Sequence, residues 1–282
     1  MAQEWTQITE PQDIRLVVAD MDGTLLDGEG KLPASFWDML KKLDERGIPF
    51  VPASGRQFQT LEDMFGDHSE TMSFIAENGN VVSYKGDIIE VHGVGKDITR
   101  TTIDAVEHAV EQGKYNIGLV ICGLHSAYIQ RIDQPFVDEC KKYYHSLTEV
   151  EDLHDVLALE DETFLKLAIF DFSDAEAMAR DLVVPIVHSP YTYTVSGAHW
   201  VDIMNEKTDK AQGVVALQKA LHVTPEQTAV FGDYLNDAGM LKEAKFSFAM
   251  ANGHDGVKEA ANYIAPANTE EGVMKVIDAI VA

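Results

Sequence analysis

Short apolar runs alternate along the chain with segments in which apolar residues recur every three or four positions. The first such pair is an apolar run at Arg15–Ala19 and, after a loop, the amphipathic segment Ala34–Arg46. Gly47 follows that segment, where a glycine commonly ends a helix. Four apolar residues share one face of the predicted helix: Phe36, Met39, Leu40 and Leu43. This alternation predicts an α/β fold, in which a mainly parallel sheet is flanked by helices.

The same pattern predicts the remaining elements. Strands are expected at Phe50–Ala53, Phe74–Ala76, Val81–Tyr84, Ile88–Val91, Gly118–Cys122, Ala127–Arg131, Leu165–Phe170, Ala229–Phe231 and Ser247–Ala249. Helices are expected at Thr102–Glu111, Pro135–Tyr143, Asp174–Asp181, Lys210–Leu221, Asp237–Ala244 and from Glu271 onward. The alternation of Tyr191, Tyr193 and Val195 favours one face of a further strand over a ligand platform. Pro49 and Pro52 conflict with the strand at Phe50–Ala53, because proline cannot donate to a central ladder.

The character of the chain changes between about residues 91 and 189, where strands and helices no longer alternate regularly. We therefore expect a Rossmann-like core built from residues 1–90 and 190–282. Residues 91–189 are expected to form an inserted α+β cap domain. The core is then discontinuous in sequence, and an insert in this position is able to cover a site on the core.

Composition narrows the choice of partners. The chain has 282 residues, of which 45% are hydrophobic, enough for a well-packed core. It carries 47 acidic and 22 basic side chains, a formal net charge of −25. That charge repels nucleic acid backbones and anionic membranes, so neither is expected as a partner. It also opposes an anionic substrate, so a phosphate ester would need a cation within the site.

Cys122 and Cys140 have no spacing typical of a zinc or redox site, and both are expected to be buried thiols. The first twelve residues lack the basic start and apolar run of a signal peptide, and no apolar stretch approaches the length of a membrane span. Together these features favour a reducing cytoplasm. The sequence leaves the oligomeric state open.

The strongest chemical signal is Asp20-Met21-Asp22-Gly23-Thr24, directly after the apolar run Leu16–Ala19. It puts two carboxylates at the carboxyl end of a strand, where ligands bind in open α/β sheets. Phosphoryl transfer needs a nucleophile and a proton donor for the leaving oxygen. We therefore expect Asp20 to attack a phosphate and Asp22 to protonate the leaving group.

A second acidic strand end is Gly232-Asp233-Tyr234-Leu235-Asn236-Asp237. Mg²⁺ prefers a few carboxylate oxygens in an octahedral set, so Asp20 and Asp233 with the backbone carbonyl of Asp22 suit it. Asn236 and Asp237 either ligate the ion or brace it. Two adjacent carboxylates without a cation would repel a phosphate by several kcal/mol at an effective dielectric of about 20. The hypothesis therefore requires Mg²⁺.

Two further segments complete a phosphate site. Ser54-Gly55-Arg56 follows the second predicted strand, and the Ser54 hydroxyl and nearby amides can donate to phosphate oxygens. Lys210 opens a predicted helix and offers a positive charge to the transferring oxygens and to Asp20. Lys207 is the competing lysine, although the helix position favours Lys210.

Each of these motifs alone is most simply a solvated turn, a cap or a surface charge. Together, in this order and at strand ends, they resemble the haloacid dehalogenase-like phosphatases. Asp20-x-Asp22-Gly23-Thr24 resembles the first motif of that family and Ser54 its second. Lys210 resembles the third motif, and Gly232-Asp233-x-x-Asn236-Asp237 the fourth. The resemblance covers nearly the whole chain.

The large insert, with Ser54-Gly55-Arg56, Glu77-Asn78-Gly79 and Asn268-x-Glu270-Glu271-Gly272-Val273, is similar to the Cof-type branch of the family. This resemblance implies a Rossmann-like core, an α+β cap, Mg²⁺, and sugar phosphates or similar small phosphorylated metabolites as substrates. It also implies that Arg56, Asn78 and Asn252 lie near the active site. Phosphate or substrate contacts are accordingly expected from Ser54, Gly55, Arg56, Asn78, Asn236 and Asn252.

Two other functions stay open. A phosphotransferase or mutase would form the same aspartyl phosphate and pass it to a sugar hydroxyl. A mutase must hold two phosphate positions, and the insert is poor in arginine, with only Arg100, Arg131 and Arg180. A non-catalytic phosphate-binding regulatory protein would keep the pocket without turnover. The presence of both Asp20 and Asp22 argues for catalysis.

Overall fold

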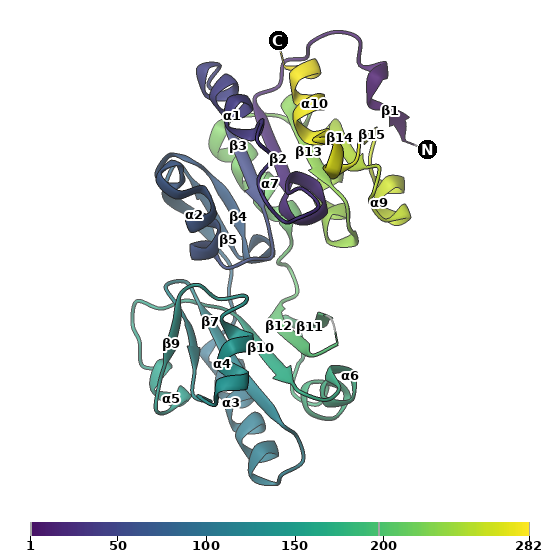
Figure 1. The fold of residues 1–282 in the computed structure, drawn as a ribbon. Coiled ribbons are helices and arrows are strands. Elements are labelled where there is room, and N and C mark those ends of the chain that lie inside the picture. Colours follow the sequence, from purple (N-terminus) through teal and green to yellow (C-terminus); the bar gives the residue numbers. More distant parts are fainter. Residues whose placement is uncertain (1, 197, 282) are drawn as a thin grey trace. The chain divides into compact units, whose positions relative to one another are not determined.

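The computed structural model describes residues 2–196 and 198–281, and the chain divides into two compact units (Figure 1). The first unit comprises Met1–Gly55, Phe65–Glu90 and Asp209–Ala282. The second comprises Arg56–Met64 and Val91–Thr208.

A nine-stranded sheet forms the centre of the first unit. Its strands are β1 (Gln3–Glu4), β2 (Leu16–Asp20), β3 (Phe50–Ala53), β4 (Phe74–Ala76), β5 (Val81–Tyr84), β6 (Asp87–Val91), β13 (Thr228–Gly232), β14 (Phe246–Met250) and β15 (Tyr263–Ala265). The order across the sheet is β1-β15-β14-β13-β2-β3-β4-β5-β6. In this order, all neighbouring strands from β1 across the sheet to β4 are parallel to each other. β5 pairs antiparallel with β4. The predicted mainly parallel sheet of an α/β fold is confirmed.

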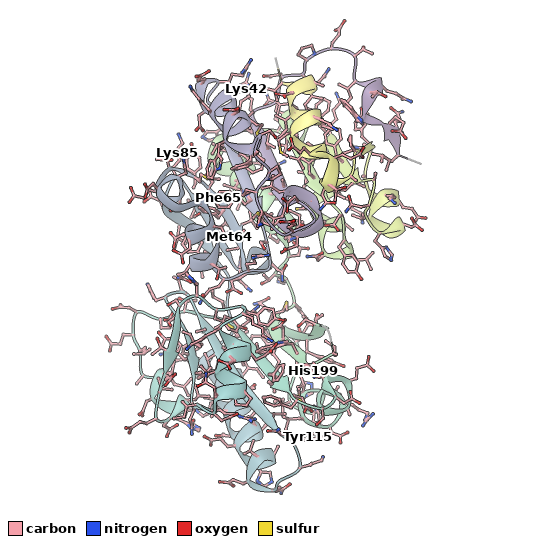
Figure 2. The ribbon with its side chains drawn as sticks, in the orientation of Figure 1. Lys42, Met64, Phe65, Lys85, Tyr115 and His199 are labelled. Carbon is pink, nitrogen blue, oxygen red and sulfur yellow. The ribbon has the colours of Figure 1, made fainter. Side chains whose placement is uncertain are left out.

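Helices cover both faces of this sheet. They are α1 (Phe36–Glu45), α7 (Lys210–Leu221), α8 (Ala238–Lys242), α9 (Asp255–Ala260) and α10 (Gly272–Ile280). Of α2 (Phe58–Phe65), only the last residue, Phe65, belongs to this unit. On one face, Val214 of α7 and Met240 of α8 pack against Leu16, Val18 and other strand residues. On the other, Phe36 of α1 contacts Phe50 at 5.4 Å between ring centroids, and Phe65 (labelled in Figure 2) contacts Phe74 at 5.6 Å. The unit is therefore a three-layer sandwich.

Pro49 precedes β3, and Pro52 fits the strand for a local reason. In a parallel strand, successive amide groups point to opposite neighbours. The Ser54 amide donates to the Ile75 carbonyl of β4, so the Pro52 nitrogen also faces the β4 side. The pairing of β3 with β4 is at Ala53 and Ile75, beyond Pro52. The strand therefore loses no ladder donor at that position.

The second unit is built on a six-stranded, mainly antiparallel sheet of order β11-β12-β10-β7-β8-β9. Its strands are β7 (Ile117–Gly123), β8 (Ala127–Ile129), β9 (Leu147–Glu149), β10 (Phe164–Asp171), β11 (Tyr191–Ser196) and β12 (Trp200–Asn205). Its helices are α3 (Lys96–Glu111), α4 (Gln134–Cys140), α5 (Leu153–Val156) and α6 (Ala175–Met178). This is the α+β composition that the sequence predicts for an insert.

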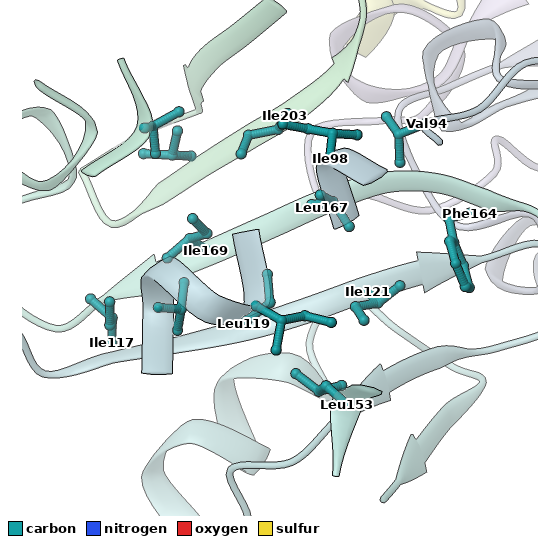
Figure 3. Packing of buried hydrophobic residues seen from close by; sticks show 14 of the residues in the cluster. Val94, Ile98, Ile117, Leu119, Ile121, Leu153, Phe164, Leu167, Ile169 and Ile203 are labelled. Atoms are coloured by element: carbon teal, nitrogen blue, oxygen red, sulfur yellow. The ribbon is translucent and has the colours of Figure 1, made fainter. Parts of the chain in front are cut away.

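Both faces of this second sheet carry apolar side chains. Figure 3 shows one face, where Leu119 and Ile121 of β7 and Leu167 and Ile169 of β10 form a cluster with Ile98 of α3. On the opposite face α4 covers a second cluster that includes Cys122, Cys140, Phe170 and Trp200. Both cysteines are buried free thiols, as expected.

The bounds of the second unit differ from the predicted insert of residues 91–189. β11 and β12 pair antiparallel with each other, and β12 pairs with β10, so residues 191–196 and 200–205 belong to the second sheet. Gln57 and Gln59 join the same unit because their side-chain amides donate to the carbonyls of Ser146 and Leu124. Within residues 2–196 and 198–281, no helix has both the length and the apolar character needed to cross a bilayer.

Candidate active site

The predicted site residues of the first unit follow the carboxyl ends of neighbouring strands. Asp20 is the last residue of β2, and Asp233 directly follows β13, which pairs parallel to β2. Ser54 directly follows β3, on the other side of β2. Because these strands are parallel, all three side chains start from the same edge of the sheet.

Gly23 allows the loop after β2 to approach the loop after β13 closely. Its φ is +81°, a conformation that favours glycine, and a Cβ atom here would overlap the Asp233 carboxylate. The next residue, Thr24, is buried and donates its hydroxyl to Asp233 Oδ1 at 3.0 Å. A glycine followed by a small hydroxyl side chain thus fixes Asp233 beside the loop that carries Asp20.

Lys210 is the basic residue of this cluster. It is the first residue of α7, whose N-terminus is capped by the Asp209 side chain accepting from the Gln212 amide. Lys210 is 1% exposed, and its Nζ donates to Asp20 Oδ1 at 2.5 Å and to Asp237 Oδ1 at 2.8 Å. Lys207 is exposed, and its backbone amide donates to the Asn205 side chain. Of the two candidate lysines, the structure brings Lys210 to Asp20.

Asp237 joins this lysine to the loop after β13. Its Oδ1 accepts from Lys210, while its Oδ2 accepts the backbone amides of Asp233 and Tyr234, each at 3.0 Å. The residue is 1% exposed. Because both of its oxygens have donors, the geometry of Asp237 is that of a brace rather than of an open ligand.

Burial dominates the electrostatics of the cluster. It raises the pKa of Asp20 to about 7, although the neighbouring Lys210 ammonium acts in the opposite direction. Burial lowers the pKa of Lys210, but the carboxylates of Asp20 and Asp237 outweigh that effect and hold it above its usual range. Burial also raises the pKa of Asp233, against the hydrogen bond from Thr24. Lys210 is therefore a permanent cation.

The same carboxylates fit a divalent metal ion. One oxygen each from Asp20, Asp233 and Asp237 lies within 4.8 Å of the others. Three carboxylates beside the single ammonium of Lys210 leave two negative charges in excess, which matches a divalent cation. All the donors are hard oxygens, the type that Mg²⁺ prefers. With Asp237 braced by Lys210 and by two amides, Asp20 and Asp233 are the better ligands.

The remaining predicted residues have varied positions. Ser54 is buried and Gly55 is half-buried, whereas Asp22 and Asn236 are exposed on the loops after β2 and β13. Arg56 falls in the second unit, where its Nη1 lies 3.6 Å from the Met64 sulfur. Arg56 is therefore assigned to the second unit, and its substrate contact stays a prediction.

Asn252 holds the Asp20 loop through its own side chain. Its Nδ2 donates to the Gly23 carbonyl at 2.8 Å, and its Oδ1 accepts the amide of Asn268 at 3.0 Å. Asn268 in turn donates its Nδ2 to the Leu26 carbonyl at 2.8 Å. These two asparagines tie the Asp20 loop at both ends.

Sequence reasoning did not assign a role to Thr24, Asn268 or Asp209. Thr24 and Asn268 lie inside the motifs that carry the family resemblance. The sequence therefore marked their positions but did not indicate what their side chains contact. Their partners are more than 200 positions away along the chain. Asp209 is a typical helix-capping residue before Lys210, and that position could have identified it.

A second group of possible metal ligands lies in the second unit. Ligand atoms of Asp104, Glu107 and His154 lie within 4.8 Å of one another. The group lies near the surface, and both nitrogens of His154 already pair with carboxylates, Nε2 with Asp104 at 2.8 Å and Nδ1 with Asp152 at 3.0 Å. An ion-paired histidine explains this group without a metal.

Comparison with known proteins matches the chain to a family model and to named relatives. Residues 17–277 match the family model described as haloacid dehalogenase-like hydrolase. YbjI of Escherichia coli, named a 5-amino-6-(5-phospho-D-ribitylamino)uracil phosphatase, is 32% identical over 272 residues, which cover 95% of this chain and 96% of YbjI. YcsE of Bacillus subtilis carries the same activity in its name and is 25% identical over 269 residues, 95% of this chain and 96% of YcsE.

Solved structures share the fold over most of the chain. A Streptococcus mutans protein, SMU.1108c, is 30% identical, with a TM-score of 0.74 over 94% of this chain and 98% of its own. A Thermotoga maritima protein is 22% identical, with a TM-score of 0.83 over 95% of this chain and 98% of its own. The two-unit architecture is therefore shared by proteins of quite different sequence.

Proposed function

Because this chain belongs to the haloacid dehalogenase-like hydrolase family, we propose that it is a Mg²⁺-dependent phosphatase that hydrolyses a small phosphorylated metabolite through an aspartyl phosphate on Asp20. The observation that carries the proposal is the buried cluster at the carboxyl ends of β2 and β13. There Lys210 contacts Asp20 and Asp237, and Thr24 holds Asp233. A buried ammonium beside three carboxylates is costly for a fold, and phosphoryl transfer gives it a purpose.

In this mechanism Asp20 is the nucleophile. A carboxylate oxygen of Asp20 forms a bond to phosphorus as the bond from phosphorus to the leaving oxygen breaks. Asp22, exposed two residues further along, donates its proton to that leaving oxygen. Water then attacks the phosphorus of the acyl phosphate and regenerates Asp20, with Asp22 accepting the proton of the water.

Lys210 and Ser54 orient the phosphoryl group. The Lys210 ammonium is fixed before substrate arrives, because it donates to Asp237 Oδ1, and Asp237 is itself held by the loop amides that donate to its Oδ2. A charge that needs no rearrangement is most effective at stabilising the oxygens of the transferring group. Ser54 offers a hydroxyl from the end of the adjacent β3, and Asn236 is exposed on the loop after Asp233.

Asp20 and Asp233, with the backbone carbonyl of Asp22, would hold the Mg²⁺. The ion would neutralise charge on the phosphoryl oxygens, which the chain's own excess of carboxylates cannot do. In this arrangement Asp237 is not a ligand, because its two oxygens already accept from Lys210 and from the Asp233 and Tyr234 amides.

The relatives suggest where a substrate search should begin. YbjI and YcsE are named for a phosphorylated ribitylamino pyrimidine, and we propose a sugar phosphate or a sugar-alcohol phosphate of this size as the substrate class. The second unit is proposed to act as the cap that selects the substrate. A cytoplasmic location is proposed because both cysteines are buried free thiols.

The test is hydrolysis of p-nitrophenyl phosphate by the wild type and by Asp20→Asn, each with Mg²⁺ and with a chelator. We expect turnover only for the wild type with Mg²⁺, and trapping of the phosphorylated wild type by rapid acid quench. Undiminished turnover by Asp20→Asn would show that Asp20 is not the nucleophile. Turnover that survives complete chelation would remove Mg²⁺ from the mechanism.

A further inference from the structure

A left-handed turn follows β4 at the same edge of the sheet as the candidate site. Three consecutive residues there have positive φ angles: Glu77 at 51°, Asn78 at 55° and Gly79 at 99°. For residues other than glycine, this conformation costs about 1 kcal/mol or more, and it persists only where the surroundings impose it. The contacts on the two sides of this turn explain why the fold retains it.

On one side the turn lies against the segment that follows β3. The Asn78 amide donates to the Ser54 carbonyl at 2.9 Å. A Cβ atom at Gly55 would lie 2.9 Å from Asn78 Nδ2 and 3.1 Å from its Oδ1, so the Asn78 carboxamide rests directly on the Gly55 backbone. The turn therefore supports Ser54 and Gly55 through one hydrogen bond and one close packing contact.

On the other side the turn lies against the helix that carries Lys210. A Cβ atom at Gly79 would overlap the carbonyl oxygen of Asp209, the residue immediately before Lys210. A second glycine extends this close contact, since a Cβ atom at Gly213 of α7 would lie 2.7 Å from the Ile75 side chain of β4. The start of α7 is thus seated on β4 and on the turn that follows it.

From these contacts we propose that the turn Glu77–Gly79 is a positioning element that sets the distance between Ser54 and Lys210, the two groups that orient the phosphoryl group. The inference rests on the proposed function. Asn78 acts in it through Ser54 and Gly55, and Gly79 acts through Asp209 and Lys210. The left-handed backbone is what lets one short turn contact both segments, because an extended residue at Gly79 would carry the chain away from Asp209.

The test compares two Gly→Ala variants of the full chain. Gly79→Ala combines a positive φ with an overlap on Asp209, whereas Gly47→Ala has a similar strain (φ +68°) with nothing within 4 Å of the new Cβ atom. Kinetics with p-nitrophenyl phosphate and Mg²⁺ are measured well below each thermal midpoint, so that only folded enzyme is compared.

We expect kcat to fall at least about tenfold in Gly79→Ala, since displacement of a catalytic group by a fraction of an ångström is costly. Gly47→Ala should stay within about twofold of the wild type. Equal kcat values for the two variants would overturn the proposal.

A second variant covers the case in which Gly79→Ala does not fold. Asn78→Gly adds no atom and adopts a positive φ without strain, so the fold tolerates it, but it removes the carboxamide from Gly55. We expect competitive inhibition by inorganic phosphate to weaken at least about threefold, because Gly55, the residue after Ser54, loses the carboxamide packed on it, while kcat changes less. Unchanged inhibition by phosphate would contradict the proposal. A wild type that hydrolyses no phosphate ester would instead overturn the proposed function, and this inference with it.

Discussion

The two units differ in how deeply their most buried ion pairs lie, although both also carry exposed pairs, such as Lys42–Asp278 in the first unit. In the first unit, Lys210 and Asp237 form an ion pair with both side chains 1% exposed. In the second, His154 and Asp104 pair with side chains 28% and 62% exposed, and Lys114 and Asp181 with 51% and 34%. Both units have well-filled apolar clusters, so the difference lies in where charge is placed.

Burying charge has a cost that surface pairing avoids. Removing an ion from water costs several kcal/mol even in a paired state, whereas an exposed pair is worth about 0 to 1 kcal/mol. Among the described residues of the second unit, the ion pair Lys166–Asp202 is 11% and 16% exposed, and no three carboxylates gather around a buried ammonium. The buried charges of the first unit are therefore not a requirement of stable folding, and catalysis is the simplest explanation for them.

The sharpest way to test this difference is to remove the buried cation. Lys210→Met should lower kcat by about 10²- to 10³-fold, the loss typical of removing one pre-positioned electrostatic group. Lys207→Met is the matched control, because Lys207 is exposed three positions earlier, and it should leave kcat unchanged. Steady-state kinetics with p-nitrophenyl phosphate distinguish the two. A large loss in Lys207→Met alone would return the choice of lysine to Lys207.

Removal of the brace should affect stability nearly as strongly. Asp237→Ala leaves Lys210 with one carboxylate fewer and the amides of Asp233 and Tyr234 without their acceptor. We expect the free energy of unfolding to fall by about 3 kcal/mol, as for other broken buried pairs. Urea unfolding in the presence of a chelator measures this without a contribution from bound metal.

Asp104→Ala in the second unit is the comparison for that variant. Its carboxylate pairs with His154 at the surface, so its removal should change the free energy of unfolding far less. Equal losses in Asp104→Ala and Asp237→Ala would mean that burial does not distinguish the two ion pairs.

A substitution in the apolar cluster should show that the second unit is stabilised mainly by apolar packing rather than by ion pairs. Ile169 is 0% exposed in the cluster of Figure 3, and Ile169→Val should lower the free energy of unfolding by about 1 kcal/mol. Ile132 is 63% exposed, so the same substitution there should have an effect below about 0.5 kcal/mol. Thermal and urea unfolding of both variants test this contrast, which fails if the two losses are alike.

The smallest effect concerns pH. The hydrogen bond that His154 donates to Asp104 raises the pKa of His154, with Asp152 adding to it and burial opposing it. The pair therefore stabilises the fold below the unfolded-state pKa of about 6.5, and the contribution is lost as pH rises through the folded-state pKa. Solvent screens this exposed pair, so His154→Gln should cost no more than about 0.5 kcal/mol at about pH 5.5 and nothing at about pH 9. Urea unfolding at both pH values is the measurement. A loss that grows with pH would have the wrong sign.

The sequence alone was sufficient to predict the parallel sheet and to identify the family. Apolar runs such as Leu16–Asp20 are buried on both faces, so their pattern survives any detail of packing. The chemical residues that the sequence indicated at strand ends, Asp20 and Asp233, lie beside each other because neighbouring parallel strands end at one edge. The family assignment, made from four short motifs, is confirmed by a match over residues 17–277.

Long-range pairing explains what the sequence could not provide. The assignment of residues 190–208 to the core was natural from their position, but β12 pairs with β10 across about thirty residues. Likewise, nothing local to Gly79 indicates that its Cα packs on Asp209, 130 positions later. Asn252 was expected to contact substrate, and only the structure shows that its side chain is engaged with Gly23 and Asn268.

The strand order of the first unit also determines how long β2 lacks a neighbouring strand during synthesis on the ribosome. β2 carries Asp20, the proposed nucleophile, yet its neighbour β13 is made more than 200 residues later. At about 5 to 20 residues per second, synthesis leaves β2 without that partner for about 10 to 40 s. Throughout this interval the nascent chain has an apolar strand with an open edge and no Asp233, and for most of it no Lys210. A chain interrupted before Thr228 is therefore a candidate for aggregation or chaperone capture, and it has no means of forming the site.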